Sequence, residues 1–160
     1  MRLFIAIELS DEMKKDLIGV MHELKKAGVK GQYAPAGNLH LTLAFIGETE
    51  DLKAVRAAVE SIRFKPFHMT LSELGNFDDI IWAGAKGGQG IAELGREVRA
   101  ALDEAGIPYD KKGFLPHITL IRKASGNYRK TQVPKTGMMV KKITVMKSEV
   151  KDGKRKYSAV

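Results

Sequence analysis

The sequence predicts an α+β fold whose two halves are related by an internal repeat. Amphipathic helical segments and short strand-like runs both recur along the 160 residues. One helix–loop–strand unit occurs twice, and each copy ends in the pattern His-x-Thr-Leu. No Gly/Ser-rich linker divides the chain, so residues 1–160 are expected to form a single domain.

The N-terminal segment predicts a strand, a helix and a second strand. Residues 2–9 form a mostly apolar run that is typical of a central strand. Ser10 is a suitable N-cap for a helix over 11–27, and Gly28 stands where a C-cap glycine belongs. Residues 38–47, NLHLTLAFIG, again have the pattern of a buried strand, apart from one histidine.

The remaining elements are predicted by the same periodicities and by turn residues. Pro66 and Gly106 close two further helices, and the turn KDGK joins two strands of a terminal hairpin. In chain order, these elements are a helix over 52–62, strands over 67–74 and 80–85, a helix over 91–105, a strand over 114–123, and strands over 140–150 and 156–160.

The composition is that of a globular protein with unevenly distributed charge. Residues 1–80 carry 10 Lys and Arg against 12 Asp and Glu, whereas residues 81–160 carry 17 against 7. A positive half favours an anionic partner such as nucleic acid, although a solvated surface would give the same pattern. Without cysteine, disulfides and thiolate catalysis are excluded. No run approaches the roughly 20 apolar residues of a membrane span, so a cytoplasmic protein without a membrane partner is expected.

The internal repeat relates two histidine motifs. The first unit runs from Ala-Gly-Val at 27–29 to His40, and the second runs from Ala-Gly-Ile at 105–107 to His117. Each linker contains a tyrosine. An approximate twofold axis between the units would bring the two His-x-Thr strands together across a shared cleft.

Each motif places a histidine and a threonine on the same face of its strand. Because side chains two apart share a face, His40 and Thr42 are expected to point into the cleft. His117 and Thr119 repeat this pattern. The alternate residues of the first motif are expected to face the core: Leu39, Leu41, Leu43 and Phe45.

The paired motifs favour phosphodiester transfer or hydrolysis without a metal. Two imidazoles that titrate near neutrality can act in one step as general base and general acid. Neighbouring threonine hydroxyls are suited to donate hydrogen bonds to phosphate oxygens. Either histidine alone would more often be structural, and a metal site would need a further ligand that neither motif supplies. His68, in FHMTL, resembles a partial third copy and is interpreted as structural.

HLTL at 40–43 and HITL at 117–120 resemble the paired H-x-T-x motifs of the two-histidine (2H) phosphoesterase superfamily. Within it, the sequence most resembles the RNA 2′,3′-cyclic phosphodiesterases, also known as the 2′-5′ RNA ligase family, over nearly the whole chain. The resemblance implies a bilobal α+β fold in which two pseudo-symmetric antiparallel sheets, with helices outside, flank a central cleft. It also implies hydrolysis of RNA 2′,3′-cyclic phosphate ends to 2′-phosphate ends without a metal or other cofactor, and reversible 2′-5′ ligation by some members.

The same resemblance assigns roles to individual residues. It makes His40 the proton donor and His117 the proton acceptor, with Thr42 and Thr119 holding the phosphate. The implied partner is RNA with a 2′,3′-cyclic phosphate end, for which tRNA fragments are candidates, and the protein is expected to be a monomer.

An arginine that the family tends to carry after the second motif matches Arg122. An odd offset of five residues from His117 would aim Arg122 at the opposite face of a regular strand. It can reach the phosphate only if the strand ends or bulges near Ile121, or if its side chain curls around the edge. Lys123 is an even number of residues from His117, so it shares the face of His117 in a regular strand and is the alternative cation for the phosphate.

Two other functions stay open. One is a basic module that binds RNA ends or a nucleotide without turnover, against which the two intact motifs argue. The other is an enzyme with the same chemistry that acts on a small nucleotide, against which the basic half argues. Four aromatic residues are candidates to stack on a base: Tyr33, Phe45, Trp82 and Tyr109. For Phe45 and Trp82, packing in the core is favoured.

Overall fold

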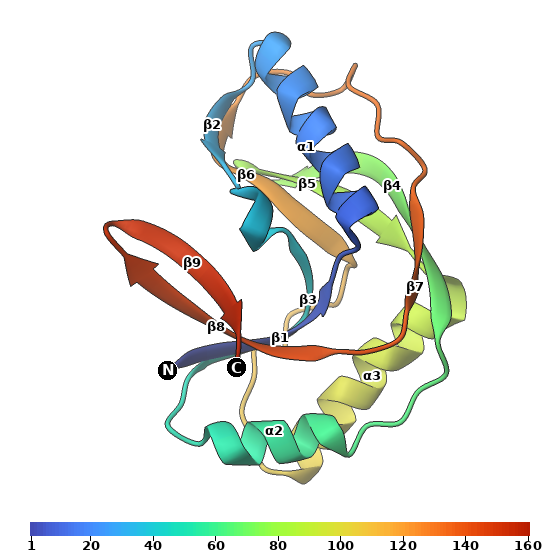
Figure 1. Ribbon diagram of the computed structural model, residues 1–160, viewed down its shortest axis with the longest axis vertical. Helices are drawn as coiled ribbons and strands as arrows, with labels where there is room; N and C mark the ends of the chain where they lie inside the picture. Colours follow the sequence, from blue (N-terminus) through green and yellow to red (C-terminus); the bar gives the residue numbers. More distant parts are fainter.

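The computed structural model describes residues 1–160 as three α-helices, a short 3₁₀ helix and two antiparallel sheets (Figure 1). The four-stranded sheet has the order β3-β1-β8-β9, with strands spanning His40–Glu48, Arg2–Glu8, Thr144–Lys151 and Lys154–Ala159. The five-stranded sheet has the order β2-β6-β5-β4-β7, with strands spanning Lys30–Tyr33, His117–Ser125, Ile80–Lys86, Phe67–Phe77 and Gly137–Val140. The predicted α+β fold with two antiparallel sheets is confirmed.

Capping residues set where the first two helices begin. Helix α1 (Asp11–Lys26) follows Ser10, whose Oγ accepts a hydrogen bond from a first-turn amide at 3.1 Å. Helix α2 (Leu52–Glu60) follows Asp51, which caps it in the same way, and α3 spans Gly88–Glu104. In Figure 1, α1 lies across the five-stranded sheet, whereas α2 and α3 lie together below the four-stranded sheet.

The apolar faces of both halves meet in one core. A cluster of 27 buried residues includes members from α1, α3 and strands of both sheets. Helix α1 contributes the residues that its periodicity predicts: Met13, Leu17, Val20, Met21 and Leu24. Because the core is shared and closely packed, it holds the two sheets in a fixed arrangement.

The internal repeat corresponds to β1–α1–β3 and β5–α3–β6, and in each unit the second strand pairs antiparallel with the first. The linker after each helix crosses to the opposite half. The Ala34 amide donates to the Leu120 carbonyl, and the Asp110 amide donates to the Phe45 carbonyl, each at 2.8 Å. Strands β3 and β6 therefore come close to each other in the middle of the molecule.

The C-terminal segment corrects one prediction. Residues 140–150 are predicted as one strand, but the chain divides into β7, at the edge of the five-stranded sheet, and β8, in the four-stranded sheet. Apolar alternation does not reveal which sheet a strand joins, so periodicity misses the crossing at 141–143. The predicted hairpin turn is correct, because Asp152 and Gly153 have φ angles of 52° and 74°, as a type I′ turn requires.

Two short elements have no counterpart in the sequence prediction. Strand β2 reads KGQY, and the 3₁₀ helix η1 (Ala36–Asn38) reads AGN. Neither sequence shows an apolar periodicity. Strand β2 lies at the edge of its sheet, and an edge strand does not need to bury both of its faces. No helix of the protein is both long and apolar enough to cross a membrane.

Candidate active site

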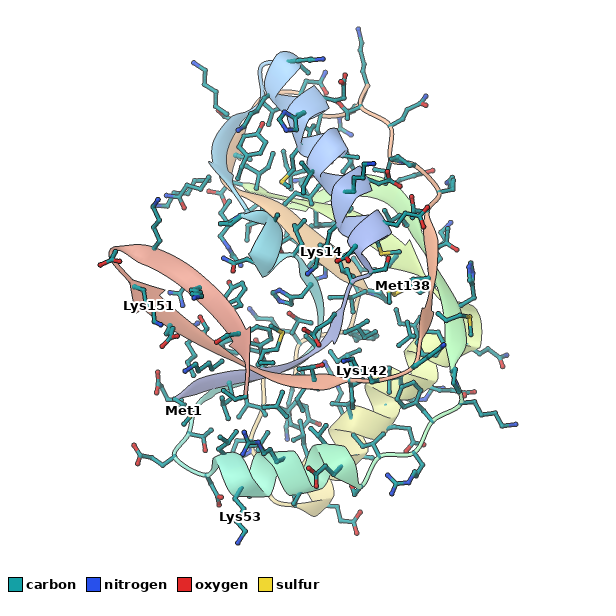
Figure 2. All side chains as sticks on the ribbon, in the orientation of Figure 1. Met1, Lys14, Lys53, Met138, Lys142 and Lys151 are labelled. Carbon is teal, nitrogen blue, oxygen red and sulfur yellow. The ribbon has the colours of Figure 1, made fainter.

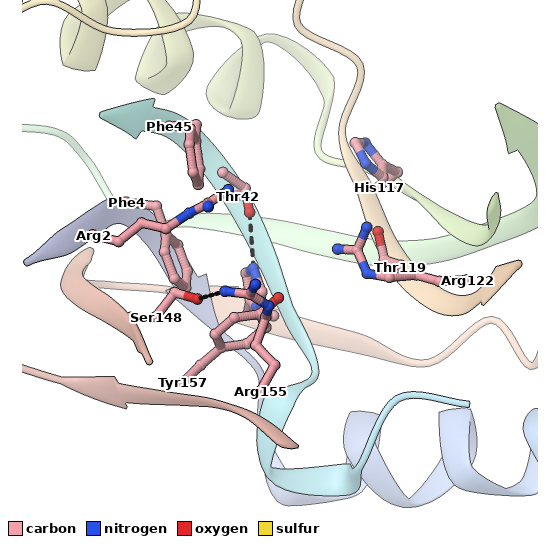
Figure 3. A pocket seen from close by; sticks show the side chains of 11 residues that line it. Arg2, Phe4, Thr42, Phe45, His117, Thr119, Arg122, Ser148, Arg155 and Tyr157 are labelled. Atoms are coloured by element: carbon pink, nitrogen blue, oxygen red, sulfur yellow. Dashed lines mark hydrogen bonds between the residues drawn. The ribbon is translucent and has the colours of Figure 1, made fainter. Parts of the chain in front are cut away.

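The two histidine motifs line one cavity of about 330 Å³ between the sheets. Strand β3 contributes His40 and Thr42, and β6 contributes His117 and Thr119. Figure 3 shows Thr42 facing His117 and Thr119 across the open space between their strands. The structure thus brings together the four motif residues that the sequence singled out.

Both histidine rings are held in the same way. His40 Nδ1 donates to the carbonyl of Asn38, and His117 Nδ1 donates to the carbonyl of Leu115, each at 2.7 Å. Because a carbonyl only accepts, Nδ1 carries a proton in both rings, and Nε2 of each neutral imidazole is the nitrogen with the accepting lone pair. Thr42 Oγ1 lies 2.8 Å from His40 Nε2 and donates to it when the ring is neutral.

The surroundings of His40 lower its pKa below the ordinary 6.5, first of all because the ring is buried. The positive charges of Arg122 and His117 act in the same direction, while the hydrogen bond to Asn38 partly opposes them. The neutral form of His40 is therefore favoured in the ligand-free protein.

Each imidazole also lies against two aromatic rings. His40 packs 4.7 Å from Phe4 and 5.1 Å from Tyr157, measured between ring centroids. His117 lies 5.1 Å from Phe77 and 5.9 Å from Trp82. These neighbours limit the ring orientations open to both histidines.

Core packing is expected for Trp82 from the sequence, but the indole does not pack there. It lies outside the core cluster, opposite Thr119 in the β5–β6 ladder and beside His117. Its ring occupies the space above Gly75, where any Cβ would collide with it, and its Nε1 is buried without a hydrogen-bond partner. The absence of a side chain at Gly75 is what admits the indole next to the histidine.

A bulge turns Arg122 into the cavity. In the β5–β6 ladder, Trp82 pairs with Thr119 and Ile81 pairs with Ile121, so Leu120 has no partner. Leu120 and Ile121 are consecutive buried residues, and the strand parity changes after them. Arg122 consequently joins the face of Thr119 and lines the cavity, whereas Lys123 does not line it (Figure 3).

The first motif contains the same bulge, which corrects the prediction for Phe45. Ala6 pairs with Thr42 and Ile5 pairs with Ala44, so Leu43 is the unpaired residue. Phe45 therefore leaves the leucine face and lines the cavity, where the Arg2 guanidinium lies 4.9 Å above its ring.

Residues from β1 and the terminal hairpin complete the cavity, and the sequence motifs do not predict them. They are Arg2, Phe4, Ser148, Arg155 and Tyr157. The available signal was the basic stretch KDGKRKY, in which alternation puts Arg155 and Tyr157 on one face. Its assignment to the cavity requires knowing that β9 folds back toward η1, which no local pattern reveals.

Asn38 connects this hairpin to the first motif. Its Nδ2 donates to the Arg155 carbonyl at 3.0 Å, and its Oδ1 accepts from the Tyr157 amide at 3.2 Å. Its own carbonyl holds His40 Nδ1. One residue thus joins the imidazole to the strand that carries Arg155 and Tyr157.

The donor set of the cavity is cationic and neutral. Its lining residues include three arginines, two histidines and three hydroxyl side chains of Ser and Thr, and no Asp or Glu. No three His, Asp or Glu side chains of the protein gather closely enough to hold a metal ion. Such a set is suited to an anion whose oxygens accept hydrogen bonds. His68, exposed on β4, lies outside the cavity.

The chain is similar to known proteins over most of its length. The model of the 2′-5′ RNA ligase superfamily matches residues 13–152. An RNA 2′,3′-cyclic phosphodiesterase of Thermotoga maritima is 32% identical over 131 residues, which cover 76% of this chain and 70% of that protein. A protein of the same name from Escherichia coli K12 is 35% identical over 131 residues, covering 78% and 73%. The crystal structure of E. coli LigT in apo form matches with a TM-score of 0.82 and 29% identity, covering 99% of this chain and 94% of that one.

Proposed function

Because this chain belongs to the 2′-5′ RNA ligase superfamily, we propose that it hydrolyses RNA 2′,3′-cyclic phosphate ends to 2′-phosphate ends. His40 and His117 perform the proton transfers, and no metal takes part. The observation that carries this proposal is the pair of imidazoles on β3 and β6 at one anion-suited cavity, each held through Nδ1 so that proton transfer falls to Nε2.

The reaction needs two opposite proton transfers. Water attacks the phosphorus atom and loses a proton to Nε2 of His117, which acts as the general base. The bond from phosphorus to the 3′ oxygen breaks, and that oxygen takes a proton from Nε2 of His40. The products are a 2′-phosphate and a 3′-hydroxyl, and the next turnover requires His40 to regain a proton and His117 to lose one.

Phosphate-binding groups stabilise the charge that develops at phosphorus. Thr42 and Thr119 donate their hydroxyl protons to non-bridging oxygens, and Arg122 supplies a guanidinium on the same side as Thr119. The lowered pKa of His40 makes its protonated form a stronger acid toward the leaving oxygen. The bound phosphate, being anionic, offsets the charge of Arg122 and helps His40 to acquire its proton.

The proposal extends to the setting in which the chain works. Residues 1–160 act as one unit, which the shared 27-residue core supports. The protein acts in the cytoplasm as a monomer on RNA ends, with tRNA fragments among them. Attack on the cyclic phosphate by a 5′-hydroxyl in place of water, with the same departure of the 3′ oxygen, would join two RNA ends through a 2′-5′ linkage, and the reverse step would re-form the cyclic phosphate and release the 5′-hydroxyl end.

The test is an oligoribonucleotide with a 2′,3′-cyclic phosphate end, incubated with the protein in excess EDTA. We expect conversion to the 2′-phosphate at an undiminished rate. His40→Ala or His117→Ala should each lower the rate by about 10²–10⁴-fold with the fold retained. His68→Ala, also in a His-x-Thr sequence but outside the cavity, is the matched control and should leave the rate unchanged. Binding of the oligonucleotide without turnover would instead identify a binding module.

A further inference from the structure

A second cavity, of about 510 Å³, opens beside the central one. It lies between the β2–η1 segment, strand β6 and the turn of the β8–β9 hairpin. The residues that it shares with the central cavity are His40, Thr119, Arg122, Arg155 and Tyr157. A ligand held between the two histidines can therefore continue into this second cavity, which we name the basic arm.

Positive charge dominates the basic arm. Arg122, Lys154 and Arg155 line it, and no Asp or Glu is among its lining residues. Arg155 is held in place, because its Nη1 donates to Ser148 Oγ at 2.6 Å and its carbonyl accepts from Asn38 at 3.0 Å. A cation fixed in this way binds an anionic oxygen with little loss of side-chain freedom.

A third cavity, of about 540 Å³, opens from the other side of the central one and differs in charge. It shares Thr42, Phe45 and His117 with the central cavity. Its charged lining residues are three aspartates and two cations: Asp78, Asp79, Asp110, Arg99 and Lys112. A polyanion that leaves the central cavity therefore meets net attraction in the basic arm and net repulsion on this side.

The total charge of the protein does not by itself identify a path. Lysines such as Lys14, Lys53, Lys142 and Lys151 project from separate parts of the chain over the surface (Figure 2). In the basic arm, cations continue directly from the residues around the two histidines with no acidic residue among them, whereas the two cations of the third cavity are outnumbered by aspartates. Local placement, rather than the net charge of +8, thus points to the route of an anionic strand.

We propose that the basic arm binds the RNA strand on the 5′ side of the terminal nucleotide, with its first internucleotide phosphate at Lys154 and Arg155. This inference rests on the proposed function, which puts the cyclic phosphate between His40 and His117. The first internucleotide phosphate is the next anionic group along the strand. The protein therefore acts on chains of two or more nucleotides in preference to a cyclic mononucleotide.

Three substrates test the role of that phosphate. They are a nucleoside 2′,3′-cyclic phosphate, a dinucleotide that ends in the same group, and the same dinucleotide with a neutral methylphosphonate at its internucleotide linkage. We expect kcat/KM for the normal dinucleotide to exceed that for the mononucleotide by about tenfold, the contribution of one charge-assisted hydrogen-bonded contact. The methylphosphonate should remove most of this advantage.

A pair of lysine variants locates the contact. Lys154→Ser should lower kcat/KM for the normal dinucleotide several-fold, with little change for the methylphosphonate or the mononucleotide. Lys156→Ser removes an equal charge from the same strand, but Lys156, which is exposed like Lys154, does not line the arm, so this control should behave as the unaltered protein.

The outcomes separate the two proposals. Hydrolysis of the mononucleotide and both dinucleotides with equal kcat/KM would reject the basic arm as a strand-binding site and leave the proposed function intact. Equal losses on all three substrates in Lys154→Ser would reject it as well. If the unaltered protein hydrolyses none of them, the proposed function fails, and the strand path fails with it.

Discussion

Phe45 and Arg122 hold equivalent positions in the two halves of the protein. Each follows its motif histidine by five residues, and each lines the cavity because the leucine two residues before it is unpaired in a bulge. The same backbone device thus presents an aromatic ring from β3 and a guanidinium from β6. The pseudo-symmetric scaffold therefore produces a chemically asymmetric cavity, and only the β6 side has a cation at this position.

Arg122 is expected to act both on the phosphate and on His40. Arg122→Gln removes a positive charge that lowers the His40 pKa, so that pKa should rise toward its ordinary value. Loss of a charge-assisted contact should also lower kcat/KM for a cyclic phosphate by about 10–100-fold. NMR titration of the His40 ring and steady-state kinetics measure the two effects. Lys123→Gln removes the neighbouring charge, which does not line the cavity, and should produce neither change; an equal effect from it would contradict a role specific to Arg122.

Asn38 is expected to be a positioning residue for the terminal hairpin. Asn38→Ala keeps the carbonyl that holds His40 Nδ1 but removes both side-chain hydrogen bonds to β9. We expect a loss of about 1–2 kcal/mol in the free energy of unfolding and a larger KM, because Arg155 is no longer held at the cavity. Chemical denaturation and kinetics measure these effects.

A control separates this role from the general cost of losing an asparagine. The Asn127 side chain makes one local hydrogen bond, in which its Oδ1 accepts from the Arg129 amide, away from the central cavity. Asn127→Ala should leave KM unchanged. A KM for Asn38→Ala equal to that of the unaltered protein would show that the hairpin keeps Arg155 in place without this residue.

The elements with strong periodicity were predictable from the sequence, and so were the four motif residues. A strand that alternates every two residues puts His40 with Thr42 and His117 with Thr119 without reference to the rest of the fold. That rule does not determine the faces on which Phe45 and Arg122 lie, because a single unpaired residue moves all later side chains of the strand to the opposite face. Arg122 can reach the phosphate only if the strand ends or bulges near Ile121, or if its side chain curls around the edge. The internal repeat extends the bulge to the equivalent position of Phe45.

The contributions of Arg2, Phe4, Ser148, Arg155 and Tyr157 could not be predicted from local patterns. They belong to strands far from the motifs in sequence, and they reach the cavity through the strand order β3-β1-β8-β9. The crossing from β7 to β8 between the sheets is equally non-local. Long-range pairing of this kind depends on the whole chain, whereas periodicity reports only the immediate surroundings of each residue.

His40 is expected to make the stability of the protein depend on pH. Its pKa is lowered in the folded protein, chiefly by burial, whereas the unfolded chain has the ordinary value of 6.5. Between the two values the unfolded state binds a proton that the folded state does not, so this contribution is present above 6.5 and is lost as the pH falls through the lowered pKa. Chemical denaturation at about pH 7.5 and about pH 5 measures the change.

Two variants isolate this effect from other acid-sensitive groups. His40→Gln is neutral at every pH and should reduce the loss of stability between the two conditions. His68→Gln, at an exposed position, should leave that loss as it is in the unaltered protein. If both variants lose stability on acidification to the same extent as the unaltered protein, the burial of His40 does not govern this dependence.

The last prediction concerns which histidine gives a proton and which takes one. If His40 is the acid, an analogue in which sulfur replaces the leaving 3′ oxygen no longer needs it, because a thiolate leaves without protonation far more readily than an alkoxide. This analogue should restore much of the activity of His40→Ala and little of that of His117→Ala, since water must still lose a proton. The unaltered protein should show a bell-shaped dependence of kcat/KM on pH with the natural substrate, and loss of its alkaline limb with the analogue. Restoration of His117→Ala instead would exchange the two roles. Restoration of neither variant, together with a flat pH dependence, would mean that the imidazoles bind the phosphate without transferring protons.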